Sequence, residues 1–415
     1  MSATAAPATA DQAGKPKEAK KNRLSGGFFR FVLTRFLLII PTVFILVTVV
    51  FFVMRATGDP ISAALGGRLT PQELQARIHA AGYDKPLIVQ YFEYLGNLLH
   101  GNLGTTMTDN QPVVSILARY GSATFELAFL ALIVALVVGI GLGRVAARRR
   151  DHAADAGIRT FAILCYATPV FFLGLILKLI FAIWLNALPA SGRSSLATEM
   201  QFSRLVSPTG FYIIDALQLG DMNVLADVLR HAVLPALALG LLTAGVFIRL
   251  VRTNVISTFN SGYVEAARSR GVSEKRLLNK HAWRPALIPI ITVMGMQIAM
   301  MLAGAVLTET TFEWKGLGFM LSQYLKARDF VAVQGIVILI AIIVAVLLSI
   351  FAGVLLGLVS GYFGGWVDRV LVMIADAIYS FPSLLLAILM AIMISHGQSG
   401  LWSGILASGI SITVV

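Results

Sequence analysis

The stretch Tyr263–Pro289, YVEAARSRGVSEKRLLNKHAWRPALIP, separates two long apolar segments at residues 232–248 and 286–308. Both segments are apolar enough to cross a bilayer, so the polar stretch between them lies at a membrane face. Only Glu265 and Glu274 oppose the basic residues that dominate it. These basic residues, in and beside the stretch, are Arg249, Arg252, Arg268, Arg270, Lys275, Arg276, Lys280 and Arg284. Because short loops rich in Lys and Arg stay in the cytoplasm, the stretch is predicted to be cytoplasmic.

The composition of the chain is that of an integral membrane protein. Of its 415 residues, 57% are hydrophobic and 13% are charged, whereas soluble domains carry about 25% charged residues. The net charge of +12 does not indicate nucleic-acid binding, because the basic residues cluster beside apolar segments and report membrane orientation. A single cysteine, Cys165, excludes an intrachain disulfide and a cysteine metal cluster, and no metal site is predicted.

Hydrophobic runs predict a bundle of transmembrane helices. The predicted spans are residues 31–54, 123–146, 158–186, 232–248 and 286–308, and a sixth begins near Val331. Residues 1–30 lack hydrophobic periodicity and are predicted to form a disordered, basic, cytoplasmic tail. The order of the spans then places residues 55–121 and 187–231 outside the membrane. Residues 31–350 are therefore predicted to form one six-helix unit.

An internal repeat points to a second unit. VGIGLGRVA at 138–146 is similar to AGVLLGLVS at 352–360, so residues 346–415 are predicted to begin another unit of the same kind. The thirty residues 331–360 are nearly all apolar, and as one helix they would extend about 45 Å, beyond a hydrocarbon core of about 30 Å. Either one tilted helix protrudes into the cytoplasm, which the topology favours, or the segment breaks near Gly353.

The pattern Glu-Ala-Ala at residues 265–267, followed by Gly271 and an apolar ending at Pro289, resembles the EAA loop of bacterial ABC importer permeases. We call residues 252–285 the EAA-like loop. Other patches over residues 30–343 resemble the first permease subunit of the dipeptide, oligopeptide and nickel importers. They are DKPLIVQYFEYLGNLLHGNLG, ATFELAFLAL, ATPVFFLGL, LPASGR and LTETTFEWKGLG.

The resemblance implies an all-α, polytopic transmembrane helical bundle of the type I ABC importer permease fold, in the inner (plasma) membrane of a bacterium. It also implies the partners: a second permease subunit, two ATP-binding cassette ATPase subunits and an extracytoplasmic substrate-binding protein. ATP would be bound by the partner subunits, so no cofactor is expected in this chain. The N-terminus is expected in the cytoplasm.

Residues 346–415 resemble the start of the second permease subunit of the same importers, through AGVLLGLVSGYFGGWVDRV at 352–370. The segment departs from the pattern of that subunit, because its first span, its EAA loop and everything after are missing. A natural fusion, a truncated gene product and a fragment all remain open, as does the question whether this partial unit functions.

The EAA-like loop is predicted to dock on an ATPase, since small side chains allow its short helix to pack closely against another protein. The residues predicted to carry this coupling are Tyr263, Glu265, Ala266, Ala267, Arg268, Gly271, Leu277 and Pro289. Gly271 is expected to turn the chain with a positive φ. The plainer interpretation is an ordinary cytoplasmic loop that contains one helical turn.

Three residues within or at the ends of spans are candidates for the transport pathway. Lys178 would meet a peptide carboxylate, or would extend along its helix to the outer headgroups. Glu309 would meet the substrate amine or close a gate, or would be a surface acid at a helix end. Pro169 would bend its helix for movement, or merely for better packing.

Other functional classes fit less well. An enzyme is not predicted, because the chain lacks the GxxxxGK[ST], HExxH and GxSxG motifs. An ion-coupled secondary transporter is the main rival, since internal repeats occur in that class too. The predicted function is the ATP-driven import of di- or oligopeptides from an external binding protein, with nickel or other small solutes as the alternative cargo.

Overall fold

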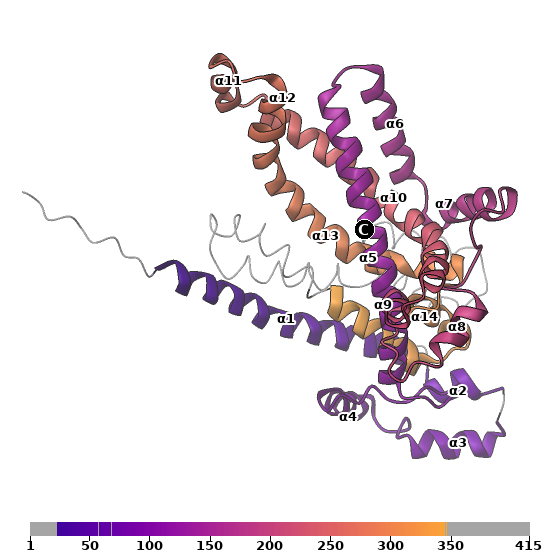
Figure 1. The fold of residues 1–415 in the computed structure, drawn as a ribbon. Coiled ribbons are helices and arrows are strands. Elements are labelled where there is room, and N and C mark those ends of the chain that lie inside the picture. The colour runs from indigo at the N-terminus through magenta and orange to yellow at the C-terminus, as the bar shows by residue number, and fades with distance from the viewer. Residues whose placement is uncertain (1–22, 57, 68, 345, 347–415) are drawn as a thin grey trace, which may run out of the picture.

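The computed structural model describes residues 23–56, 58–67, 69–344 and 346. Over these ranges the chain forms helices and no β-strand, as Figure 1 shows. Residues 1–22 of the predicted tail lie outside the described residues, and the first helix already begins at Arg23, within that tail. The predicted partial second unit also lies outside them, apart from Val346.

The helices follow one another with short connections. They are α1 (Arg23–Ala56), α2 (Pro60–Leu65), α3 (Pro71–Ala80), α4 (Leu87–Leu99), α5 (Val113–Arg148), α6 (Ala153–Ala167), α7 (Val170–Leu177), η1 (Lys178–Trp184), α8 (Leu196–Phe202), α9 (Tyr212–Leu219), α10 (Met222–Phe259), α11 (Gly262–Ser269), α12 (Glu274–Arg276), η2 (Leu277–Ala282), α13 (Trp283–Phe312) and α14 (Leu317–Lys326). A last helix covers Phe330–Val344. The two η elements are π-helical.

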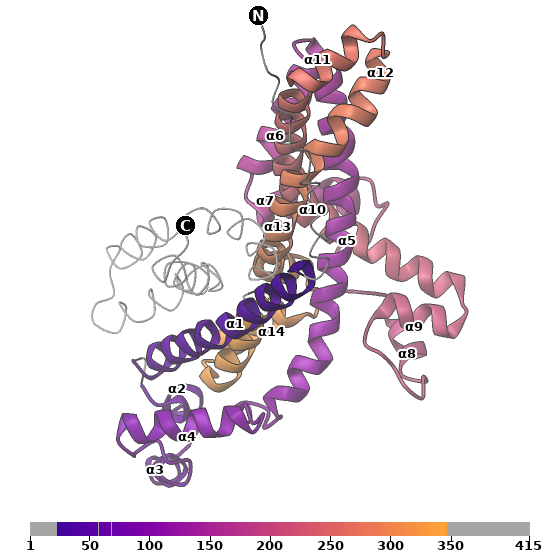
Figure 2. The same ribbon diagram turned by 90° about the vertical axis from the view of Figure 1, so that its left-hand side faces the viewer.

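The long helices run between two polar ends of the molecule. Helices α11 and α12 lie at one end, and α2, α3 and α4 lie at the other (Figures 1 and 2). Among the described residues, α5 and α10 are each long and apolar enough to cross a membrane alone. Two bent pairs qualify as well, α6 with α7–η1 and the segment from α12 into α13, and Ile40–Ala56 and Phe330–Val344 are shorter apolar helices. Within the described residues, the segments predicted to span the membrane are mainly helical.

The third predicted span, residues 158–186, is not one continuous helix. It is broken between α6 and α7, and the two parts are bent by 108°. Thr168 is extended, with φ −83° and ψ 125°, because a following proline disfavours the helical conformation. Pro169 also lacks the N–H that would continue the helix. The bend predicted at Pro169 is therefore confirmed.

Helices α5 and α10 pack against each other along most of their length, and glycines on both allow the close approach. A Cβ at Gly139 would lie 2.5 Å from Cβ of Phe247, and one at Gly143 would lie 2.7 Å from Cβ of Val251. On α10, a Cβ at Gly240 would lie 2.6 Å from the backbone oxygen of Ala131. Small residues of this kind bring transmembrane helices together, so the glycines of the repeat have a packing role in the first unit.

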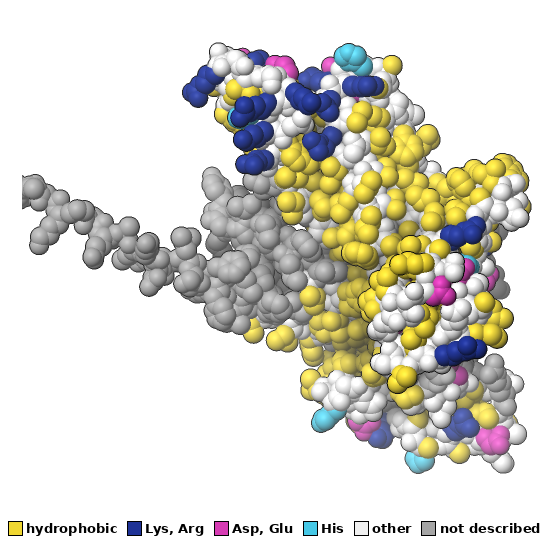
Figure 3. Space-filling view, in the orientation of Figure 1, with side chains coloured by type: hydrophobic (Ala, Val, Ile, Leu, Met, Phe, Trp, Pro, Cys, Tyr) yellow, Lys and Arg dark blue, Asp and Glu magenta, His cyan; other side chains and the backbone are white. Residues whose placement is uncertain are grey.

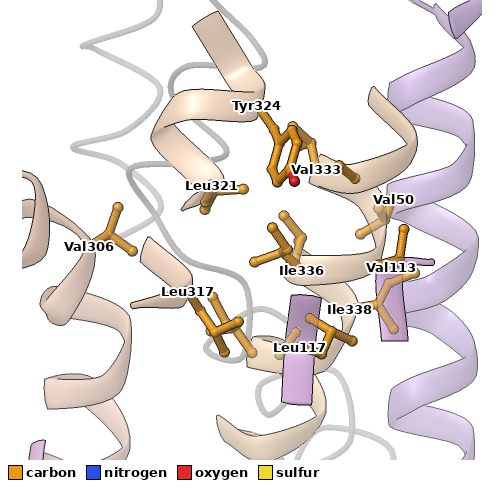
Figure 4. Close-up of a cluster of buried hydrophobic side chains, with 14 of the residues drawn as sticks. Val50, Val113, Leu117, Val306, Leu317, Leu321, Tyr324, Val333, Ile336 and Ile338 are labelled. Carbon is orange, nitrogen blue, oxygen red and sulfur yellow. The ribbon is translucent and has the colours of Figure 1, made fainter. Parts of the chain in front are cut away.

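The main apolar cluster joins α1, α5, α14 and the helix Phe330–Val344. Figure 4 shows side chains from these helices turned toward one another. Val50, Val113, Val333 and Ile336 are fully buried in it. The cluster lies near the end of the molecule that carries α2–α4, so it holds the first and last described helices together at that end of the bundle.

Candidate functional site

The EAA-like loop folds as two short helical segments joined by a turn. Helix α11 ends at Ser269, and the turn reaches α12 and then η2, which leads into α13. Gly271 has φ +79°, a value that only glycine adopts at little cost, and a Cβ there would meet no atom within 4 Å. The positive φ expected for Gly271 is therefore confirmed.

The tip of the loop is exposed, whereas its interior is packed. Glu265, Ala266 and Arg268 are exposed, as are Tyr263 and Gly271, and Ala267 is half-buried. Val264 and Leu277 are fully buried beneath them. Leu277 therefore supports the loop from inside, and Pro289 is half-buried within α13.

A few contacts hold the tip in shape. Nε of Arg268 donates to Oε1 of Glu274 at 2.7 Å, and this bond raises the pKa of Arg268. The guanidinium also lies 4.9 Å from the centre of the Phe259 ring. The Tyr263 hydroxyl donates to the backbone oxygen of His281 at 3.5 Å. Both side chains of the ion pair are substantially exposed, so its contribution to folding is small.

The base of the loop is tied to the long helices. Nη2 of Arg144 on α5 donates to Oδ1 of Asn279 at 3.0 Å, and the same guanidinium lies 4.6 Å from the Trp283 ring. Arg252, on the α10 segment that enters the loop, binds Asp155 with two hydrogen bonds of 2.6 and 2.7 Å. Asp155 is fully buried, so α6, α10 and the loop are held as one unit.

Lys and Arg side chains gather at this end of the molecule, over α11 and α12 and the neighbouring helix ends (Figure 3). The middle of the same face is predominantly hydrophobic. A charged end next to an apolar belt is the arrangement expected of a protein that projects a basic loop from a membrane.

Glu309 lies at the opposite end of the bundle, where it joins α13, α5 and the start of α14. It is fully buried, so the interpretation of Glu309 as a surface acid was wrong. Its carboxylate accepts from the Thr124 hydroxyl at 2.6 Å and from the Phe319 N–H at 2.9 Å. A Cβ at Gly316 would lie 2.5 Å from the carboxylate carbon, so glycine leaves the room that the acid needs.

A buried ion pair lies close to Glu309. Arg193 donates to Glu126 at 2.5 Å, and the two residues are 6% and 5% exposed. Glu126 also accepts from the Ile213 N–H at 2.8 Å, and the guanidinium lies 3.7 Å from the Tyr212 ring. With Thr124 and Glu309 these residues form what we call the outer network, which ties the 185–213 segment to α5.

Lys178 begins the π-helical turn η1 and is half-buried. Its ammonium donates to the backbone oxygen of Thr311 at 3.2 Å and lies 5.9 Å from the Phe312 ring. The lysine therefore binds the end of α13. Its role in a transport pathway, like those of Pro169 and Glu309, stays a prediction.

Sequence reasoning missed Glu126 and Arg193 as a pair. Glu126 lies in an apolar run of the second span, and an acid in such a run was the available signal, since charged residues inside spans are rare. Arg193 was noticed only as part of an outer motif. In the part of the chain that the structure describes, no group of three or more metal-ligating side chains comes together.

Comparison with known proteins places the chain in a family. Residues 139–352 match the family described as binding-protein-dependent transport system inner membrane component, and residues 28–127 match the N-terminal domain of the same kind of membrane component. The di/tripeptide transport system permease protein DppB of Pseudomonas aeruginosa is 37% identical over 313 residues, which cover 75% of this chain and 92% of that protein. The dipeptide transport system permease protein DppB of Escherichia coli is 36% identical over 315 residues, with coverages of 75% and 92%. The probable D,D-dipeptide transport system permease protein DdpB of Escherichia coli is 36% identical over 284 residues, with coverages of 68% and 82%.

The chain therefore belongs to the inner membrane components of binding-protein-dependent transport systems, and its helical bundle is the type I permease fold of ABC importers.

Proposed function

We propose that the chain carries di- or oligopeptides across the inner membrane as one permease subunit of an ATP-driven importer. The family is a transport component and not an enzyme family, so the energy has to come from partner subunits. Three similar proteins named for dipeptide or tripeptide transport support peptides as the cargo over nickel or another small solute.

In this proposal the EAA-like loop faces the cytoplasm, and so does the N-terminus. The basic end of the molecule, over α11 and α12, supports this orientation. Helices α2–α4, α8, α9 and α14 then lie outside, where a substrate-binding protein delivers the peptide. The membrane region between the two ends is shared with a second permease subunit.

The observation that carries the proposal is the division of the EAA-like loop into an exposed tip and an anchored base. Glu265, Ala266 and Gly271 are exposed and small or polar, which suits docking into a cleft on an ATPase. The Arg144–Asn279 and Arg252–Asp155 contacts connect the base to α5, α6 and α10. Closure of two partner ATPases around ATP would thereby move the membrane helices as levers.

The repeat also leads us to propose that residues 346–415 begin a second permease unit on the same chain. If this partial unit contributes to the transport pathway, the importer needs less from a separate second permease subunit.

The test is co-purification of the full chain, in detergent, with the ATPases encoded beside it. Gly271→Arg adds a large cation at the exposed tip and is expected to abolish retention of the ATPases. Gly101→Arg is the matched control, because Gly101 has φ +74° and also meets no atom within 4 Å, but lies at the outer end. Equal retention by wild type and Gly271→Arg would contradict docking through this loop.

A further inference from the structure

The outer end of the molecule holds a polar cavity that is separate from the outer network. It has a volume of about 150 Å³. It lies between the end of α1, helix α4 and the helix Phe330–Val344, and the 81–83 and 102–104 turns complete its wall. Its polar lining includes Arg55, Gln90, Tyr94, Asn97 and Gln334.

Three buried polar atoms on this wall have no hydrogen-bond partner among the described residues. They are Nε of Arg55, Oε1 of Gln90 and Nε2 of Gln334. Gln90 is 8% exposed and Gln334 is 7% exposed, so water outside the cavity does not replace the missing bonds. Buried polar groups are paired in the great majority of cases, and three unpaired ones around one cavity indicate a bound molecule that pairs them.

The side chains are held so that these atoms remain available. Nε2 of Gln90 donates to the backbone oxygens of Tyr83 at 2.9 Å and of Lys85 at 2.8 Å, which fixes the amide and leaves Oε1 as an acceptor. The guanidinium of Arg55 lies 4.4 Å from the Tyr83 ring. The carboxylate on the wall, Glu93, pairs with Lys85 at 2.6 Å, and among the described residues no acid forms an ion pair with Arg55 within 4.0 Å.

The wall therefore offers a cation, an N–H donor and a separate acceptor. Arg55 and the Gln334 amide N–H suit a carboxylate, and Arg55 can do so with charge-assisted hydrogen bonds. Gln90 Oε1 suits an ammonium or hydroxyl donor on the same molecule.

We propose that this cavity binds a free α-amino acid, with its carboxylate at Arg55 and Gln334 and its ammonium at Gln90. Exposed Ala81, Asn97 and Asn102 form the rim through which the molecule enters from outside. Its volume of about 150 Å³ has room for one small amino acid. A bound amino acid would connect α1, α4 and the last described helix, so occupancy would stiffen this outer corner.

The test is a calorimetric titration of the purified full chain with L-alanine. Saturable one-to-one binding is expected. Gln334→Leu and Gln90→Leu should each raise the dissociation constant by about tenfold or more, because each removes one hydrogen bond to a charged group of the ligand. The apparent Tm of Gln334→Leu is compared with that of wild type, so that weaker binding is not mistaken for a loss of folding. Gln323→Leu, on the exposed face of α14, is the matched control and should bind as wild type does.

Three results would overturn the proposal. Absence of any binding heat up to millimolar L-alanine would mean that the cavity holds ordered water only. Unchanged affinity in both Gln→Leu variants would place the alanine elsewhere. Equal binding of L-alanyl-L-alanine, lost in the same variants, would contradict a site for a single free amino acid. None of these readouts depends on transport, so they are independent of the co-purification experiment.

Discussion

Charged residues gather at two places in this molecule, and the two places differ in burial. In the outer network, Glu126 and Arg193 are 5% and 6% exposed and Glu309 is fully buried. In the EAA-like loop, the side chains of Arg268 and Glu274 are 40% and 63% exposed. The outer network joins segments far apart in the chain, whereas the loop pair joins residues only six positions apart.

The difference indicates what each set of charges does. A buried charge that loses its partner is strongly destabilising, so the outer network fixes one arrangement of α5, α13 and the 185–213 segment. An exposed ion pair contributes little to folding and leaves its groups free to meet another protein. We therefore expect changes in the outer network to lower stability, and changes at the loop tip to alter partner binding alone.

The largest effect is expected for Arg193→Ala. It leaves the buried Glu126 carboxylate without its cation, which costs about 3–5 kcal/mol of folding free energy. It also removes the ring contact with Tyr212. The apparent Tm of the purified chain in detergent, followed by tryptophan fluorescence, should fall by many degrees.

Arg204→Ala is the control for this change, because Arg204 is an exposed arginine of the same outer segment. Its apparent Tm should match that of wild type. If both variants melted alike, the Arg193–Glu126 pair would not stabilise the outer network, and the contrast between the two regions would fail.

A smaller effect is expected for Glu309→Gln. Thr124 accepts from the Leu317 N–H at 2.8 Å, so its own hydroxyl hydrogen points to one carboxylate oxygen, while Phe319 N–H donates to the other. A glutamine amide offers one acceptor oxygen in place of two, and its NH₂ group would face another hydrogen-bond donor. This change should lower the free energy of unfolding by about 1–3 kcal/mol. The apparent Tm should drop less than for Arg193→Ala. Glu313→Gln, an exposed acid four residues on, should leave it unchanged.

The sequence indicated the helical bundle and the turn of the EAA-like loop because both depend on local patterns. Long apolar runs predict spans whatever they pack against, and Gly271 marks a turn by its lack of a side chain. The Arg193–Glu126 pair was not predictable in this way, because its members lie 67 residues apart and only the folded chain brings them together. Likewise, an apolar residue in a polar loop can face a partner protein or the interior, and only the folded chain shows that Leu277 is buried.

The smallest effect on stability, and the most informative for the loop, is expected for Glu265→Gln. Glu265 is exposed at the tip and has no ion-pair partner within 4.0 Å among the described residues, so the apparent Tm should not change. Retention of the ATPases should weaken and lose part of its dependence on salt, because an exposed charge at an interface acts mainly through long-range attraction. Glu274→Gln removes the same charge from the same loop, but Glu274 is already paired with Arg268. This variant should therefore weaken retention of the ATPases less. A lower Tm for Glu265→Gln, or equal retention by the two variants across the salt range, would show that the tip charges serve the fold and would end the distinction between the two regions.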